Sequence, residues 1–495
     1  MISEPVYDTK QIRSIEEEIF TSTPSFVLME RAGRYIAELA IRLQQNDCKN
    51  VHLVAGSGNN GGDAYIAAKH LVDNNINVTL QSVANPNDLP KDAKKAYDAW
   101  LLCGGTTVDT FDDEGRYDVI IDGLFGIGLT RNIEGDLKNL VASINAHPAS
   151  VISIDTPSGL NADTGEIMGC CIRADHTVTF LGYKIGLHTG LGPDHAGEIH
   201  FSNLNADRIA GPENTGYLIG KEVLRNTLQP RKPSSHKGTN GHAVIIGGAK
   251  GMTGAAILAG RAALNLGCGR VTLHLLGPSP SVDIQQPELM LTDNDDALDI
   301  DSVNCFAIGP GLGKSDAAKT LLERVTSKDA PLILDADALN IVAEERKIQK
   351  LIFDRSGSTL VTPHPREAAR LLDTSTEEVQ KNRVKSAIEI SHMLNCDTVL
   401  KGTGSICAFN EGSWFINTSG NAGLASAGMG DILTGFIAAF ICQGATTQSA
   451  LLTSTHLHGL SADILVEEGV GPIGLTASEV IETARDIFNK IVTTT

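Results

Sequence analysis

The sequence alternates short β-rich runs with helical segments, and it does so in two separate series. The first series covers residues 51–159, and the second begins at residue 242. Such alternation favours a parallel sheet with helices on both of its faces. At 495 residues the chain also exceeds a single hydrophobic core, since a domain typically holds about 150 residues. The sequence therefore predicts two α/β domains, and we place their boundary so that they cover residues 1–220 and 221–495.

The first series predicts where a ligand site would lie. The runs VHLVAG, NVTLQSV, DVIIDGL and SVISI are rich in β-branched residues and predict strands, and they alternate with expected helices over 63–72, 91–103 and 134–146. Two further helices are expected over residues 9–45, on either side of the helix breaker Pro24. In a parallel sheet of this kind, ligands bind beyond the carboxyl ends of the strands, so the loops there are the candidate sites.

The acidic charge of the chain excludes several classes of partner. Lys and Arg number 40 against 59 Asp and Glu, which gives a net charge of −19. A nucleic-acid-binding surface or a surface for anionic membranes would need an excess of basic residues, so we expect neither partner. A phosphate-bearing ligand must instead be held by local geometry, and glycine, at 50 of 495 residues, is frequent enough to form the loops that this requires.

The cysteines and the apolar segments indicate a cytoplasmic protein. The nine cysteines form no C-x-x-C pair, so neither a zinc site nor a disulfide framework is indicated, and reduced thiols are expected. The N-terminus MISEPVYD has neither the basic nor the apolar region of a signal peptide. The longest apolar run, at residues 432–442, is too short to span a bilayer.

The first glycine loop, GSGNNGGD at residues 56–63, follows a strand and opens a helix. Its glycines satisfy the G-x-G-x-x-G pattern of dinucleotide-binding domains. An ordinary dinucleotide site also needs an acidic residue about 20 positions later, and none stands there before Asp88. A tight strand–helix turn, with Asp63 near the positive end of the helix dipole, would explain the glycines but not the two asparagines.

Two further strand ends in the first series carry acidic residues. Asp122 opens the loop DGLFGIGLTRN, and Asp155 opens the loop DTPSGLNADTG. A single aspartate at a strand end is often a capping residue. Three loops that bring asparagine, aspartate and serine side chains to one edge of a sheet predict a functional site instead.

These loops resemble a known family. GNNGGD, DGLFGIG, DTPSGLNADTG and the later TFLGYKIGL are similar to the epimerase domain of the bifunctional NAD(P)H-hydrate repair enzymes, over about residues 10–215. The resemblance implies a Rossmann-like three-layer sandwich that interconverts the R and S forms of NADHX and NADPHX, in which the nicotinamide ring is hydrated. Ala64 stands where the family commonly has glycine, but it is also small.

The resemblance implies roles for individual residues. Asn60, Asp122 and Ser158 would hold a potassium ion, since their oxygen atoms suit a hard monovalent cation. Asp155 would be the general acid–base that assists departure and return of the ring hydroxyl. Lys184 either assists through its charge or is a solvated strand end. The hydrate would be contacted by Asn59, Asn60, Gly61, Gly62, Asp63, Gly126, Ile127, Gly128, Leu129, Thr130, Arg131, Asn132 and Asp155.

The second series carries several loops with chemical potential but no Walker pattern. In LDADALN, Asp335 and Asp337 could be catalytic, but we favour a plain N-capping role for the helix that follows. VLKGTGSICAF predicts a hairpin with a glycine turn. Together with GNAGLASAGMGDIL, that turn could hold a diphosphate and an adenosine through backbone groups, without much positive charge.

Six ordered motifs of the second series also resemble a family. GGAKGMTGAA, GPGLG, LDADALN, TPHPREAARLL, LKGTGS and NAGLASAGMGD are similar to the ribokinase-like fold, in its NAD(P)H-hydrate dehydratase branch, over about residues 221–490. The resemblance implies a ribokinase-like α/β domain that dehydrates the S hydrate at the expense of ADP and releases NADH or NADPH, AMP and phosphate. Arg366 and Ala427 stand where glycine is common.

The second resemblance again implies residue roles. Asp431 would be the base for the substrate hydroxyl, and we expect the helix dipole to lower its pKa. Gly254, Gly313 and His364 would contact the hydrate, although His364 could be an ordinary loop histidine. Mg²⁺ is expected to bridge the phosphates, without a nameable protein ligand. The nucleotide would be surrounded by Lys401, Gly402, Thr403, Gly404, Ser405, Asn421, Ala422, Gly423, Leu424, Ala425, Ser426, Ala427, Gly428, Met429, Gly430 and Asp431.

The leading hypothesis is a cytoplasmic repair enzyme that acts as an isomerase and a lyase on NADHX and NADPHX, with K⁺ in the first domain, Mg²⁺ in the second and ADP as co-substrate. The resemblance implies a homo-oligomer, specifically a homotetramer. Two alternatives stay open. A ribokinase-like kinase of a small alcohol, of the thiazole or pyrimidine type, could use the same G-x-G-D motif, and a degenerate nucleotide-binding scaffold could regulate partners. The presence of Asp155 and Asp431 beside complete glycine loops argues against the scaffold.

Overall fold

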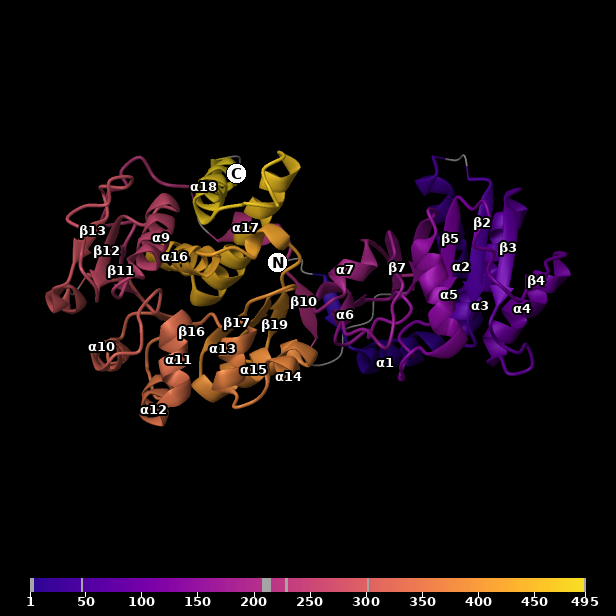
Figure 1. The fold of residues 1–495 in the computed structure, drawn as a ribbon, viewed down its shortest axis with the longest axis horizontal. Helices are drawn as coiled ribbons and strands as arrows, with labels where there is room; N and C mark the ends of the chain where they lie inside the picture. The colour runs from indigo at the N-terminus through magenta and orange to yellow at the C-terminus, as the bar shows by residue number, and fades with distance from the viewer. Residues whose placement is uncertain (1–3, 46–47, 207–214, 228–229, 301, 494–495) are drawn as a thin grey trace. The chain divides into compact units, whose positions relative to one another are not determined.

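The computed structural model describes residues 4–45, 48–206, 215–227, 230–300 and 302–493. The chain divides into two compact units (Figure 1). One unit comprises Pro5–Thr215, and the other comprises Gly216–Thr495 with the first four residues of the chain.

The N-terminal unit contains a parallel sheet in the order β4-β3-β2-β5-β6-β7-β9. A short parallel pair, β1 and β8, lies outside this sheet. The strands are β1 (Pro5–Tyr7), β2 (Asn50–Ala55), β3 (Asn77–Ser82), β4 (Thr107–Val108), β5 (Val119–Gly123), β6 (Ser150–Ile154), β7 (His176–Phe180), β8 (Tyr183–Lys184) and β9 (Glu198–Ser202). The helices are α1 (Thr9–Phe20), α2 (Ser25–Leu43), α3 (Asn59–Asp73), α4 (Lys91–Leu102), α5 (Gly135–Ala146), α6 (Ile185–His188) and α7 (Pro193–Ala196).

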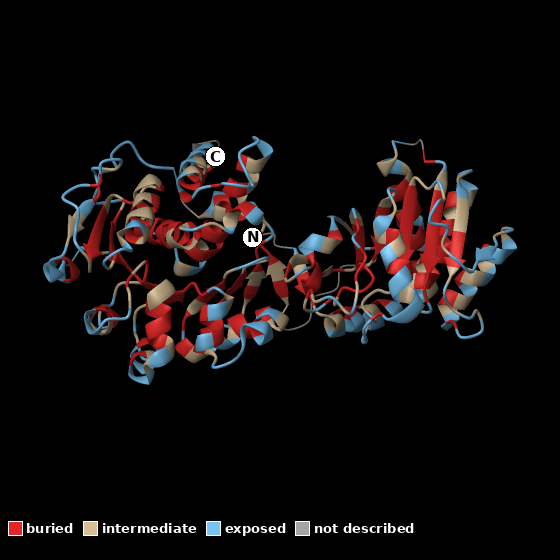
Figure 2. Cartoon of the chain, in the orientation of Figure 1, coloured by how far each residue is buried: buried red, intermediate tan, exposed pale blue. Residues whose placement is uncertain are grey.

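Alternate residues of the strands point into two separate cores. On one face, Val51 and Leu53 of β2 pack with buried residues of α1, α2, α3 and α4. On the other face, Val54 of the same strand packs against α5. Figure 2 shows the central strands buried and the covering helices exposed on their outer sides. The period of two along the strands therefore builds the three layers expected from the sequence.

The C-terminal unit contains a mixed sheet in the order β13-β12-β11-β14-β15-β16-β17-β18-β19-β10. The pairs are parallel up to β17, and the hairpin of β17 and β18 and the pair of β18 and β19 are antiparallel. The strands are β10 (Gly216–Leu218), β11 (His242–Gly247), β12 (Arg270–Leu275), β13 (Met290–Thr292), β14 (Cys305–Ile308), β15 (Leu332–Leu334), β16 (Thr359–Val361), β17 (Asp397–Leu400), β18 (Ile406–Ala408) and β19 (Trp414–Ile416).

Helices cover both faces of the mixed sheet. One layer contains α16, whose apolar residues are almost all buried because the helix packs between α9 and α17. Figure 1 shows α10 to α15 on the opposite side of the strands. The helices are α8 (Glu222–Asn226), α9 (Thr253–Asn265), α10 (Asp316–Thr326), α11 (Ala336–Glu344), α12 (Arg346–Phe353), α13 (Pro365–Leu371), α14 (Thr376–Lys381), α15 (Arg383–Leu394), α16 (Met429–Cys442), α17 (Thr447–Glu467) and α18 (Ala477–Thr493), and two short 3₁₀ helices are η1 (Asp295–Asp299) and η2 (Ala422–Leu424).

The predicted α/β class is confirmed, with a three-layer N-terminal unit and a mixed, mainly parallel sheet covered by helices in the C-terminal unit. Strands β7 and β9 fall outside the predicted runs. β9 is the edge strand, and its residues are at most partly buried, so it lacks the continuous apolar run that marks the inner strands. No helix in the described part of the chain is long and apolar enough to cross a membrane.

Candidate functional sites

In the N-terminal unit, the glycines of the first loop allow very close contact between two strand ends. The loop joins β2 to the first turn of α3, and Gly56 donates a backbone hydrogen bond to Gly123 of β5 at 2.9 Å. A Cβ atom added to Gly56 would lie 1.9 Å from the carbonyl oxygen of Leu124, and one added to Gly61 would lie 2.1 Å from the carbonyl oxygen of Gly56. The G-x-G-x-x-G pattern thus brings the paired asparagines against the loop that follows β5.

Asp122, at the carboxyl end of β5, is fully buried and lies beside Ser158. Its carboxylate accepts hydrogen bonds from Ser158 Oγ at 2.5 Å, Ser158 N at 2.9 Å and Ser153 Oγ at 2.8 Å. Burial raises the pKa of Asp122, although these donors oppose the shift. Among the described residues no basic side chain pairs with this carboxylate. A buried anion with oxygen neighbours and no countercharge fits the potassium ion that the resemblance implies.

Asn60 and Asp155 meet at Gly126, which lies in the loop after β5. A Cβ atom on Gly126 would lie 3.0 Å from Asn60 Oδ1 and 3.1 Å from Asp155 Oδ2. Asn60 Nδ2 is buried and makes no hydrogen bond with any described residue. Glycine at this position therefore leaves a small space between two polar side chains, one of which has an unused donor.

Asp155 is paired with Lys184, a residue for which the sequence left two interpretations open. Lys184 is 1% exposed, and its Nζ donates to Asp155 Oδ1 at 2.5 Å, to Thr179 Oγ1 at 2.9 Å and to the carbonyl oxygen of Phe180 at 2.7 Å. Asp155 itself adopts a left-handed backbone conformation with φ of 64°. A solvated strand end is therefore the wrong interpretation of Lys184, because all three of its N–H donors are used inside the protein.

Two more carboxyl groups lie within electrostatic range of Asp155. Burial, reinforced by Asp155 and Glu16, raises the pKa of Asp63 well above its usual range. Burial and Asp155 raise the pKa of Glu16 to about 7. The sequence analysis does not single out Glu16, which adjoins the buried stripe of Ile12, Ile15 and Ile19 on α1. Its position at the border of an apolar stripe is the signal that could have drawn attention to it.

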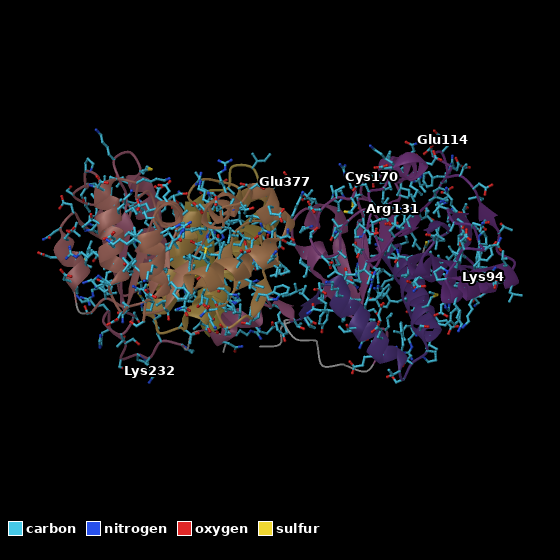
Figure 3. All side chains as sticks on the ribbon, turned by 90° about the horizontal axis from the view of Figure 1, so that it is seen from below. Lys94, Glu114, Arg131, Cys170, Lys232 and Glu377 are labelled. Carbon is cyan, nitrogen blue, oxygen red and sulfur yellow. The ribbon has the colours of Figure 1, made fainter. Side chains whose placement is uncertain are left out.

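The remaining residues predicted to contact the hydrate lie in the loop after β5. Gly128, Thr130, Arg131 and Asn132 are exposed, whereas Ile127 and Leu129 are half-buried. The loop continues into Ile133, whose backbone N–H donates to the carbonyl oxygen of Met168 at 2.9 Å. Figure 3 labels Arg131 and Cys170, which belong to the two segments joined by this bond. Within this loop, Gly126 is the residue that the structure places against both Asn60 and Asp155.

In the C-terminal unit, an ion pair between the half-buried Lys401 and the buried Asp335 lies against the first turn of α16. Lys401 Nζ donates to Asp335 Oδ1 at 2.8 Å, and Thr434 Oγ1 of α16 donates to Asp335 Oδ2 at 2.9 Å. A Cβ atom on Gly430 would lie 3.2 Å from Lys401 Nζ. Asp335 precedes α11 but its side chain makes no capping hydrogen bond, so the capping role that we favoured for Asp335 is wrong. The carboxylate of Asp335 instead positions Lys401, the one lysine of the LKGTGS and NAGLASAGMGD loops.

Asp431 occupies the third position of α16 and belongs to the same cluster. Burial, followed by the charge of Asp335, raises the pKa of Asp431 to about 6, and Lys401 opposes the shift. The expected lowering of this pKa by the helix dipole is therefore wrong in sign. The dipole contributes only a modest partial charge at the first turn, and the loss of hydration outweighs it. A carboxyl group with a pKa near neutrality is suited to exchange protons.

Arg383 supports the glycine turn of the predicted hairpin, and the sequence analysis does not identify it. The guanidinium lies 3% exposed and donates to the carbonyl oxygens of Leu400, Lys401 and Gly404. Burial lowers the pKa of Arg383 to about 10. Gly402 has φ of 132° and faces this guanidinium. A buried cation on α15 therefore fixes the conformation of this glycine turn.

His364 caps helix α13. Its Nδ1 accepts hydrogen bonds from the backbone N–H groups of Arg366 at 3.1 Å and of Glu367 at 3.2 Å, and Glu367 Oε2 accepts one from the backbone N–H of His364 at 2.8 Å. Burial and Lys401 lower the pKa of His364, whereas burial raises the pKa of Glu367 to about 7. The Arg366 side chain is exposed. His364 thus has a structural role as a helix cap, and its side chain is still 46% exposed for contact with a ligand.

The other predicted contact residues lie in glycine loops that the structure holds in place. Gly313 has φ of 71° and donates its backbone N–H to Asp337 Oδ2 at 2.9 Å, so Asp337 supports this loop. Gly254 has open space on the side where a Cβ atom would be. Asn421 accepts from Gly423 and donates to Asp463 of α17, which anchors the segment that precedes α16.

Comparison with known proteins matches both units. The family model described as "YjeF-related protein N-terminus" matches residues 25–186, and that described as "NAD(P)H-hydrate dehydratase" matches residues 243–485. A bifunctional NAD(P)H-hydrate repair enzyme of Escherichia coli strain K12 is 36% identical over 475 residues, which cover 94% of this chain and 90% of the relative. The corresponding enzyme of Coxiella burnetii is 34% identical over 495 residues, which cover 98% of this chain and 99% of the relative.

A solved structure also matches the second half of the chain. The ADP/ATP-dependent NAD(P)H-hydrate dehydratase of Bacillus subtilis, crystallised with ATP and Mg²⁺, is 31% identical with a TM-score of 0.49, and the match covers 55% of this chain and 98% of that one. The relatives from E. coli and C. burnetii match nearly end to end, in both units and in the same order. The resemblance stated from the sequence is thereby confirmed, and the chain belongs to the family of bifunctional NAD(P)H-hydrate repair enzymes.

Proposed function

We propose that the N-terminal unit interconverts the R and S forms of NADHX and NADPHX, and that the C-terminal unit dehydrates the S form with ADP. One observation carries the proposal: each unit places an acidic residue beside a lysine that is buried or half-buried, among glycine loops at the end of its sheet strands. In the N-terminal unit the pair is Asp155 with Lys184. In the C-terminal unit Lys401 pairs with Asp335 and lowers the raised pKa of Asp431.

The geometry of Asp155 supports its role as the acid–base of epimerisation. Lys184 occupies Oδ1, and Oδ2 faces the space at Gly126. In its protonated form, Oδ2 gives its proton to the ring hydroxyl, so that the C–O bond breaks, water leaves and the ring nitrogen supplies the electron pair. Water then adds to the other face of the ring and returns a proton to the carboxylate. Lys184 fixes the orientation of Asp155 throughout.

The residues Asn60, Asp122 and Ser158 would hold the potassium ion in the N-terminal unit. When bound, this ion would neutralise the buried charge of Asp122 and attract the oxygen atoms of the substrate. The hydrogen bonds from Ser158 to Asp122 bring two of the three residues together. Asn60 Oδ1 lies at Gly126, where Asp155 Oδ2 also lies.

Asp431 is proposed as the base of the dehydration. It takes the proton of the ring hydroxyl, whose oxygen attacks the terminal phosphorus of ADP, and AMP leaves. The ring nitrogen then expels the phosphate, which is a better leaving group than hydroxide, and the neighbouring ring carbon loses a proton to give NADH or NADPH. Lys401 and the backbone amides at the start of α16 would stabilise the charge of the transferred phosphoryl group.

The Mg²⁺ expected in the C-terminal unit fits the charge balance of the cluster. The carboxyl groups of Asp335, Glu367 and Asp431 lie around the single ammonium group of Lys401. An excess of acidic groups over basic ones suits a divalent cation that arrives with the nucleotide phosphates and takes oxygen ligands. When bound, the ion would neutralise part of the charge of the nucleotide phosphates.

The products of the C-terminal unit test this assignment. With pure S-NADHX and ADP, we expect AMP, phosphate and NADH in equal amounts. Chromatography measures the nucleotides, and absorbance measures NADH. A kinase of a small alcohol would instead give a phosphorylated product in an ATP-dependent reaction, and no NADH would form. Replacing ADP by ATP in the same assay identifies the donor that gives the higher kcat/KM.

Gly126 offers a prediction with a matched control. In Gly126→Ala the new methyl group would lie 3.0–3.1 Å from Asn60 Oδ1 and Asp155 Oδ2, which is too close for either to stay in place. A displacement of the acid–base by a few tenths of an ångström should lower the kcat of epimerisation about tenfold. In the first glycine loop, a Cβ atom on Gly58 meets nothing within 4 Å, so Gly58→Ala should keep wild-type kcat. Equal effects of the two changes on R-to-S conversion would contradict this placement.

The raised pKa of Asp431 predicts a stability change with pH. The group titrates at about 6 in the folded chain, whereas an unfolded aspartate titrates at about 3.9. Above pH 6 the buried carboxylate is ionised and costs stability, and below about pH 4 it is neutral in both states and the cost disappears. Asp431→Asn should therefore be more stable than the wild type at pH 8, by on the order of 2 kcal/mol, and equally stable at pH 3.5. Urea denaturation of the two proteins at both pH values measures this difference.

The compartment and the assembly state are part of the same proposal. We propose a cytoplasmic enzyme, because all nine cysteines are free thiols in the structure. The family resemblance supports a homotetramer. Light scattering should then give a particle mass about four times that of the chain, and a monomeric mass would contradict it.

A further inference from the structure

Two histidines and a glutamate of the N-terminal unit lie together at the edge of its sheet. His176 is the first residue of β7, Glu198 is the first residue of β9, and the two are directly paired in the parallel ladder. His200 follows Glu198 by two positions, so its side chain points to the same face. These residues lie at the amino ends of their strands. Asp122 and Asp155 lie at the carboxyl ends of β5 and β6, so they are at the other ends of the parallel strands from this cluster.

The donor atoms of these three side chains are spaced as metal ligands are. His176 Nδ1 lies 3.1 Å from His200 Nε2 and 3.6 Å from Glu198 Oε2. One ligand atom from each residue lies within 4.8 Å of the others. In a tetrahedral zinc site with bonds of about 2.0–2.1 Å, neighbouring ligand atoms are about 3.3 Å apart. These two separations are within about 0.3 Å of that spacing, and the third, between Glu198 and His200, is within 4.8 Å, so an ion can be held after a movement of the exposed Glu198 side chain.

The contact between the two imidazole rings also bears on metal binding. Two ring nitrogens at 3.1 Å share one proton as a hydrogen bond in the metal-free protein. A metal ion can replace this proton, because each nitrogen then presents its lone pair to the same point. Two imidazole nitrogens and one carboxylate oxygen form the ligand set of many zinc sites that keep a fourth position open for water.

We propose that His176, Glu198 and His200 bind a divalent transition-metal ion, with Zn²⁺ as the best match, and that the ion ties the edge strand β9 to β7. The side chain of Glu198 is 69% exposed and that of His176 is 18% exposed, so an ion can enter from solvent and keep a water molecule. The site lies apart from the residues proposed for epimerisation and needs none of them.

The surroundings of the cluster allow a cation to bind. Glu198 is the acidic member of the cluster, and Arg42 of α2 is the neighbouring basic residue. Arg42 is exposed on the last turn of its helix, where solvent screens its repulsion of a cation.

Zinc titration of the full chain tests the site. Calorimetry at pH 7.5 should show one Zn²⁺ per chain, and a hundredfold excess over Kd should raise the melting temperature of the N-terminal unit by about 5 °C or more. His176→Ala and His200→Ala should each weaken binding by more than the about 10–100-fold that the loss of an outer-shell partner costs. Glu198→Gln, at an exposed and nearly isosteric position, should weaken binding without a change in the metal-free melting temperature.

A histidine outside the cluster provides the control. His70→Ala, on the last turn of α3, should bind Zn²⁺ as the wild type does. Unchanged binding in His176→Ala or in Glu198→Gln would overturn the proposal, because the ion would then be held elsewhere. Absence of zinc binding by the wild type would also overturn it, and the two histidines would be a hydrogen-bonded pair only.

Discussion

Asp431→Asn should lower the rate of NADH formation from S-NADHX and ADP by about 10²- to 10⁴-fold. The amide keeps the size of the side chain but cannot take the proton of the ring hydroxyl. Asp431 lies beside Lys401 and Asp335 in the first turn of α16, and burial raises its pKa to about 6, so its carboxylate suits the role of accepting that proton. Single-turnover measurements of NADH absorbance at pH 8 give the rate without a contribution from product release.

The affinity for ADP separates a catalytic role from a structural one. Asp431→Asn removes a negative charge next to the proposed phosphate site, so Kd for ADP should stay the same or fall, although catalysis is lost. The R-to-S conversion in the N-terminal unit should be unaffected. A variant that keeps even a tenth of the wild-type rate would show that another group is the base, and Asp335 and Glu367 would be the next to change. In the wild type, the rate should also fall as the pH drops below about 6, because Asp431 becomes protonated.

Asp155→Asn should lower the kcat of R-to-S conversion by about 10²- to 10⁴-fold and leave dehydration of pure S-NADHX unchanged. The amide cannot carry the proton from one face of the ring to the other. The ion pair with Lys184 is also lost, so the buried ammonium group keeps only neutral partners, namely the amide oxygen, Thr179 and the carbonyl oxygen of Phe180. Chromatography of the hydrates over time measures the exchange between the epimers, and therefore this step, directly.

A matched change in the same loop controls for damage to the fold. Asp163→Asn alters an exposed carboxylate that accepts hydrogen bonds from Thr9, away from Lys184. It should keep the wild-type rate of epimerisation. Equal losses in the two variants would mean that the loop, and not the carboxyl group of Asp155, limits the reaction. Melting temperatures of both proteins identify any loss that comes from unfolding.

Most of the fold could be predicted from the sequence because its signals are local. The period of two in β2 and the helical spacing of Ile12, Ile15 and Ile19 follow directly from burial on one side. Strand β9 could not be predicted in this way, because an edge strand is only partly buried and its residues are mixed. The hydrogen bonds of β7 and β9 depend on neighbours far along the chain.

The sites were predicted less completely, because their decisive contacts join distant segments. The sequence motifs identify Asp155 and Asp431, which stand next to glycine loops. They do not show that Lys184 is buried against Asp155, that Asp335 pairs with Lys401, or that Arg383 holds the turn after β17. A lysine or an arginine on an apolar segment usually points to solvent, and only the tertiary fold shows which ones are enclosed. The pKa of Asp431 depends on the same enclosure, and its direction was wrong in the prediction from the helix dipole alone.

The central claim is that two independent sites act in sequence on one substrate pool, and a mixture of R- and S-NADHX with ADP tests it directly through the amplitude of NADH formation. The wild type should convert the whole mixture, Asp155→Asn should rapidly convert only the S fraction, and Asp431→Asn should convert none. Because the sites are separate, equal amounts of the two variants mixed together should convert the whole mixture again. A fast conversion of both epimers by Asp155→Asn, or a failure of the mixed variants to convert the R fraction, would contradict the account.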